Sequence, residues 1–114
     1  MKTLIESGLE EQIYFFAINI VSFSKTLQKK NKNIAPEIVN IAGELNSKFM
    51  DILDFNQEEK INQALIECKQ LAEKSHKILM EFDCNEKELI KEKANLQIEN
   101  SVIIKKISQF VKNT

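Results

Sequence analysis

An apolar repeat between residues 9 and 27 constrains the fold of this chain more than any other feature. Large apolar side chains recur there at alternating spacings of four and three residues: Leu9, Ile13, Phe16, Ile20, Phe23 and Leu27. This spacing predicts a helix that packs lengthwise along other helices. A second apolar set lies on other sides of the same helix, namely Tyr14, Phe15, Ile18 and Val21. The apolar face is therefore wider than contact with one neighbouring helix requires.

Three later stretches carry related patterns. The four–three spacing returns between Ile38 and Ile52, a broad apolar face runs from Ile61 to Phe82, and the last stretch has a heptad at Leu89, Leu96, Ile103 and Phe110. Short polar corners separate the stretches and predict helices over residues 9–30, 36–53, 57–82 and 86–112. Two glycines and one proline among 114 residues are too few for the turns of a sheet protein.

Corners this short place consecutive helices antiparallel to each other. We therefore expect an all-α protein, an antiparallel up-down-up-down four-helix bundle, in which residues 1–114 form a single domain. Gly8 separates a short lead-in from the first helix. Asn56 with Glu59, and Asn85 with Glu88, have the spacing of capping boxes at the starts of the third and fourth helices.

A glycine in the middle of the second predicted helix needs its own explanation. Gly43 costs the helix about 1 kcal/mol relative to alanine at that position. A close crossing of two helix backbones beside Ala42 would compensate for this cost, and we expect such a crossing there. The alternative is a functional hinge at this glycine.

Residues that could carry catalysis are few. His76 is the only histidine, and it forms a single Glu-x-x-His spacing with Glu73, whereas di-metal bundles use two copies. Cys68 and Cys84 do not complete a metal-ligand set with it. We expect His76 at the edge of the apolar face, Cys68 in the core and Cys84 in a corner. The chain is thus predicted to be no enzyme, with no catalytic residue, metal, cofactor or small-molecule substrate.

Charge is nearly balanced overall but differs between the two ends of the expected bundle. The formal net charge is −1, and all 16 basic residues are lysines. The end of the first helix and the following turn carry a lysine cluster that is the candidate nucleic-acid-binding site: Lys25, Lys29, Lys30 and Lys32. The alternative is that these are solvated lysines that complement the helix dipole.

Counting apolar faces predicts self-association. Tyr14, Phe15, Ile18 and Val21 cannot all point at the bundle axis together with the residues of the first stripe. Some must be exposed in a monomer, and they are the predicted interface of a homo-oligomer. The alternative is that the lead-in at Leu4 or the tail near Val111 folds back over them.

The order of these features resembles a known family of small four-helix bundles. An aromatic-rich first helix (QIYFFAINIVSFSKTLQKK), a second helix with proline at its start (APEIVNIAGELNSKFMDIL) and a terminal IIKKISQFVK segment are similar to proteins encoded in intervening sequences of bacterial 23S ribosomal RNA genes. Relatives include the accessory variability determinant of diversity-generating retroelements. Residues 45–54 lack the small-residue segment that members commonly carry. The resemblance implies the same fold, a ring-like homo-oligomer and no catalytic residue.

Two functional hypotheses result. The first is a non-catalytic, self-associating accessory bundle that assists a nucleic-acid-processing partner, such as a reverse transcriptase. The alternative is a protein-only adaptor or inhibitor that binds a partner protein through helix faces. With two cysteines, no signal segment and no apolar run long enough to cross a membrane, we expect a cytoplasmic location.

Overall fold

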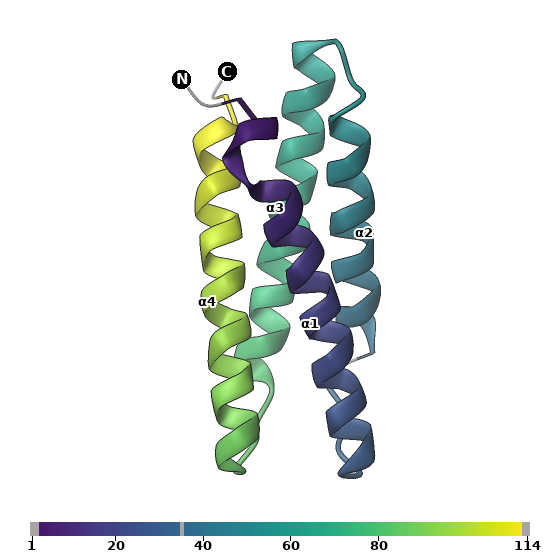
Figure 1. Cartoon of the computed structure of the whole chain (residues 1–114), viewed down its shortest axis with the longest axis vertical. Helices are drawn as coiled ribbons and strands as arrows, with labels where there is room; N and C mark the ends of the chain where they lie inside the picture. Colours follow the sequence, from purple (N-terminus) through teal and green to yellow (C-terminus); the bar gives the residue numbers. More distant parts are fainter. Residues whose placement is uncertain (1–2, 35, 113–114) are drawn as a thin grey trace.

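The computed structural model of this chain describes residues 3–34 and 36–112. Within them, four α-helices pack side by side in an antiparallel bundle that measures 46 × 23 × 21 Å (Figure 1). The elements in chain order are a single 3₁₀ turn η1 (Ile5–Ser7), α1 (Leu9–Lys29), α2 (Glu37–Ile52), α3 (Glu58–Glu81) and α4 (Lys87–Phe110). The predicted all-α four-helix bundle is confirmed.

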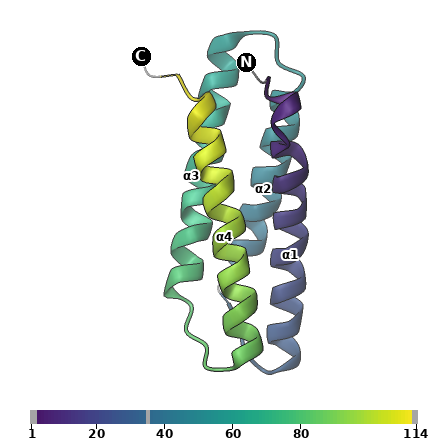
Figure 2. The same ribbon diagram turned by 60° about the vertical axis from the view of Figure 1, so that its left-hand side comes forward.

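The helices form a four-cornered array in which each one packs mainly against two neighbours. α1 and α3 each contact both α2 and α4. The α1–α2 and α3–α4 corners lie at one end of the bundle, which we call the loop end (Figure 2). The α2–α3 corner lies at the other end together with η1 and the end of α4 (Figures 1 and 2). The first helix therefore begins beside the point where the last helix ends.

The predicted stripes form the core, except that Ile61, Phe82 and Phe110 are only partly buried against it. All six residues of the α1 stripe, from Leu9 to Leu27, are at most 2% exposed. The four–three repeat of α2 is buried in the same way from Ile38 to Ile52. The contributions of the last two helices are Leu65, Cys68, Leu71, Ala72 and Leu79 from α3, and Leu89, Leu96, Ile103 and Ile107 from α4. Helical period alone thus selects the side chains that leave water.

Two polar residues lie fully inside this core, Ser75 of α3 and Asn100 of α4. The Nδ2 of Asn100 donates a hydrogen bond to the Ala72 carbonyl at 2.9 Å. The Asn100 Oδ1 and the Ser75 Oγ have no hydrogen-bond partner among the described residues. A buried polar atom without a partner costs stability. The core therefore contains two polar atoms whose burial is not offset by a hydrogen bond within the described residues.

The starts of α3 and α4 differ from the prediction. The residues before these helices are Gln57 and Glu86, and neither side chain makes a capping hydrogen bond. Asn56 and Asn85 lie one residue farther upstream than the capping position. From there a side chain is badly placed to reach the unpaired N–H groups of the first turn. The two predicted capping boxes are wrong.

The two glycines stand in different environments. Gly8 joins η1 to α1 with φ at +80°, in the left-handed region that favours glycine, so the predicted break is confirmed. Gly43 lies in the middle of α2 and is exposed, and apart from its own chain neighbours and the surrounding helix backbone, no atom lies within 4 Å of the position that a Cβ would take. The predicted close crossing at Gly43 is wrong, because this residue lies on the solvent side of α2.

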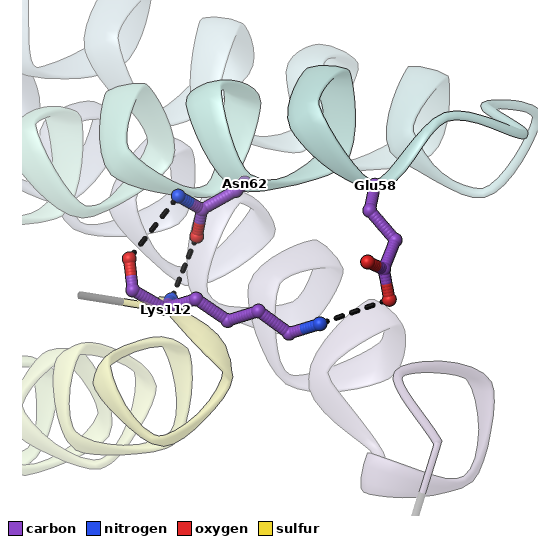
Figure 3. Close-up of polar contacts among 3 residues, drawn as sticks. All are labelled: Glu58, Asn62 and Lys112. Carbon is purple, nitrogen blue, oxygen red and sulfur yellow. Dashed lines mark hydrogen bonds and ion pairs between the residues drawn. The ribbon is translucent and has the colours of Figure 1, made fainter. Parts of the chain in front are cut away.

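Both ends of the described chain are held where η1, α3 and α4 meet. The backbone of Lys112 exchanges two hydrogen bonds with the side-chain amide of Asn62, and the Lys112 Nζ lies 2.9 Å from the Glu58 carboxylate (Figure 3). Near the other terminus, the Lys106 Nζ donates a hydrogen bond to the Ser7 carbonyl at 3.0 Å. These contacts connect the first and last segments to the bundle.

Candidate interaction surface

The solvent side of α1 carries four large apolar side chains, which we call the α1 apolar face: Tyr14, Phe15, Ile18 and Val21. Their exposed fractions are 51%, 56%, 43% and 36%. Each residue of a helix is rotated by about 100° from the one before it, so Ile18 lies opposite the buried stripe and the other three flank it. The prediction that some of these side chains are exposed in a single copy is confirmed, and all four of them are. Within the described residues, neither the lead-in nor the tail covers them.

The apolar surface continues from α1 onto α4. A groove of about 500 Å³ separates the two helices, and Phe15 lines it together with Ile98 and Val102 of α4. Ile98 is 63% exposed, which makes it one of the most exposed large apolar side chains of the molecule. Farther along, the Asn19 Nδ2 donates to both carboxylate oxygens of Glu99 at 3.1 Å. This polar bridge crosses the groove between α1 and α4.

On its other side, the surface continues from α1 onto α2. Tyr14 and Met50 line a second hollow of about 420 Å³ between these helices. The rings of Tyr14 and Phe15 pack edge to face with their centroids 5.7 Å apart. This ring pair connects the two hollows, so apolar side chains cross the molecule from α4 over α1 to α2.

Charges of opposite sign lie at the two ends of the α1 apolar face. Glu10 and Glu11 precede it and Lys25 and Lys29 follow it along the helix. Glu11, Lys25 and Lys29 are exposed. Among residues 3–34 and 36–112, none of these four charges takes part in an ion pair within 4 Å. The ends of this face therefore offer unpaired charges to a binding partner.

In the predicted lysine cluster, two of the four lysines are paired with an acidic residue that immediately precedes α4. Lys30 and Lys32 both pair with the carboxylate of Glu86, at 2.8 and 3.0 Å. Hydrogen bonds from these two lysines lower the pKa of Glu86, and the same carboxylate raises the pKa of Lys30. Lys25 and Lys29 belong to α1 itself, and neither makes such a pair in the described part of the chain. The four lysines thus do not present four equivalent unpaired charges.

The histidine and the two cysteines lie on α3 and in the α3–α4 corner. His76 is partly buried on α3, and its Nδ1 has no partner among the described residues. Cys68 is buried as predicted, and burial raises the pKa of its thiol to about 12. Cys84 lies in the α3–α4 corner, partly buried. Within residues 3–34 and 36–112, no three His, Cys, Asp or Glu side chains gather as a metal site would require.

Several members of this surface were not predicted from the sequence. Ile98 and Met50 lie outside the apolar repeats of their own helices, so the sequence alone indicates only two isolated surface residues. Val102 widens the apolar face of its helix, which indicates an apolar surface there. The spacing along that helix does not show, however, that Phe15 of α1 lines the same groove. These three residues join the α1 apolar face only because α2 and α4 flank α1.

Comparison with known proteins adds no assignment. No family model matches the sequence, and no curated protein or solved structure matches it either. The resemblance to the intervening-sequence proteins stays a prediction. Across the part of the chain that the structure describes, no helix combines the length and apolar character that a membrane crossing needs.

Proposed function

We propose that this protein is a non-catalytic association module that binds protein through the α1 apolar face and associates with itself. The observation that carries this proposal is the concentration of four exposed, large apolar side chains on one helix, extended onto both neighbouring helices. Contiguous apolar patches on soluble proteins mark interaction sites. Tyr and Phe also supply much contact area at a low cost in side-chain entropy.

Two further features support a role in association. The rest of the chain is a regular bundle whose buried stripes need no partner. Within the described residues, no three His, Cys, Asp or Glu side chains gather as they would around a metal ion. Two unpaired cysteines fit a reducing compartment, and we place this role in the cytoplasm. A nucleic-acid-processing partner such as a reverse transcriptase is the extension that the family resemblance suggests.

Sedimentation velocity of Ile18→Asp tests the proposal, because a carboxylate at the centre of an apolar interface is strongly unfavourable. We expect the parent protein to sediment above the 13.2 kDa of one chain at micromolar concentration, and I18D to sediment as a monomer with unchanged helical circular dichroism. Ile90→Asp is the matched control, since Ile90 is 47% exposed on α4 and lines none of these hollows. A parent protein that stays monomeric, or an I90D variant that dissociates equally, contradicts the proposal.

A further inference from the structure

The charges along the solvent side of α1 are arranged symmetrically about Ile18. Glu11 stands seven residues before Ile18 and Lys25 seven residues after it. Seven residues are almost two helical turns, so each charge is displaced by only about 20° from the line through Ile18. Both side chains are exposed and neither takes part in an ion pair among the described residues. An acid, an apolar centre and a base therefore lie on one line along the helix.

The apolar residues share this symmetry. With about 100° per residue, Tyr14 and Val21 lie on one side of the line through Ile18, four residues before it and three after it. Phe15 and Ser22 lie on the other side, three residues before it and four after it. A helix that faces an antiparallel copy of itself about a two-fold axis at Ile18 brings each of these pairs to the same level. Tyr14 then meets Val21 of the second copy, and Phe15 meets Ser22 of the second copy.

From this pattern we propose that two copies of the chain form a two-fold symmetric dimer through antiparallel α1 helices centred on Ile18. In a two-fold interface, each contact between two different residues occurs twice. Glu11 of each copy faces Lys25 of the other, which closes both ends of the apolar contact with opposite charges. A parallel pairing would instead place Glu11 beside Glu11 and Lys25 beside Lys25. This charge complementarity selects the antiparallel arrangement and a second copy as the occupant.

This inference rests on the proposed self-association and adds its geometry, which charge reversal tests. Lys25→Glu places a second carboxylate opposite Glu11 at both ends of the contact, and we expect the dissociation constant to rise on the order of tenfold at low salt. The double variant Glu11→Lys/Lys25→Glu restores both pairs with inverted sign, so its dissociation constant should return to that of the parent. Lys77→Glu, at an exposed position of α3, is the matched control and should leave dimerisation unchanged. High salt should reduce the effect of K25E, because exposed charges are screened.

The outcomes separate the geometry from the proposed function. If I18D dissociates the protein while K25E has no effect, the α1 apolar face is the interface but the antiparallel pairing is wrong. If K25E weakens the dimer and the double variant does not restore it, the Glu11–Lys25 contact is refuted. A parent mass above twice 13.2 kDa overturns the closed dimer in favour of a larger ring. A monomeric parent overturns both proposals.

Discussion

Asn62 and Lys112 form a reciprocal pair that joins the first turns of α3 to the residues after α4. The Lys112 N–H donates to the Asn62 Oδ1 at 2.7 Å, and the Asn62 Nδ2 donates to the Lys112 carbonyl at 3.2 Å. The Asn62 side-chain amide thus pairs with both the N–H and the carbonyl of the Lys112 backbone. The pair spans 50 residues of sequence, so its formation depends on the folded bundle.

Asn62→Ala should release the segment after α4, because both hydrogen bonds are lost together. We expect the free energy of unfolding to fall by about 1 kcal/mol. The amide of Lys112 should also exchange with solvent much faster than in the parent protein. Lys112→Gln, which removes only the exposed ion pair to Glu58, is the control and should leave that amide protected. Equal exchange in N62A and the parent would show that the pair does not form in solution.

The two glycines should respond in opposite directions to alanine. Gly43→Ala should raise the free energy of unfolding by about 1 kcal/mol, because the position is helical, exposed and open around the missing Cβ. Gly8→Ala should lower it by about 1 kcal/mol, because a positive φ strains any residue with a Cβ. Urea unfolding of both variants measures these changes in the free energy of unfolding. Destabilisation by G43A would revive the predicted close crossing in α2.

Two adjacent phenylalanines distinguish the core from the proposed interface. Phe16 is fully buried and Phe15 is 56% exposed. Phe16→Ala should therefore cost about 3–5 kcal/mol through lost contacts and the resulting cavity. Phe15→Ala should change the stability of the monomer by less than about 0.5 kcal/mol. Chemical denaturation at protein concentrations below dimerisation compares them, and equal shifts in midpoint would mean that the α1 stripe is assigned to the wrong side.

The Cys68 thiol should be protected from reaction. Burial raises its pKa to about 12, so almost no thiolate forms near neutral pH. An aromatic disulfide reagent should modify Cys84, which is only partly buried, well before Cys68. Because the pKa is higher in the folded than in the unfolded state, this thiol's contribution to stability is complete below its ordinary pKa and is lost as pH rises toward 12. Rapid modification of Cys68 in the native protein would contradict its burial.

Glu86 should control any nucleic-acid binding at the loop end. Glu86→Gln leaves Lys30 and Lys32 without their carboxylate partner, so it should increase affinity for duplex DNA and steepen its salt dependence. Changing Lys25, Lys29, Lys30 and Lys32 together to Gln should lower this affinity. It should also make the slope of log affinity against log salt concentration shallower by about 0.9 for each lost phosphate contact. Filter binding at several salt concentrations measures both. A parent protein and an E86Q variant that both fail to bind would exclude this site.

The inward and outward sides of each helix could be predicted from the spacing of apolar residues. The six residues from Leu9 to Leu27 are buried, and Tyr14 and Ile18 are exposed, because helical period is a local property that a single chain segment carries. The short corners likewise specified that consecutive helices run antiparallel. Both inferences needed only the pattern within one segment and the length of the connections between segments.

Only the packing of the helices shows which residues of different helices are neighbours. Lys30 meets Glu86 across 56 residues of sequence, and Phe15 shares a groove with Ile98. These neighbours depend on the register and crossing of packed helices, which the spacing along one helix does not specify. Gly43 shows the same limit, because its surroundings are set by the place of α2 in the bundle. Each stripe is encoded locally, while the packing of the four helices fixes which surface the outward residues build together.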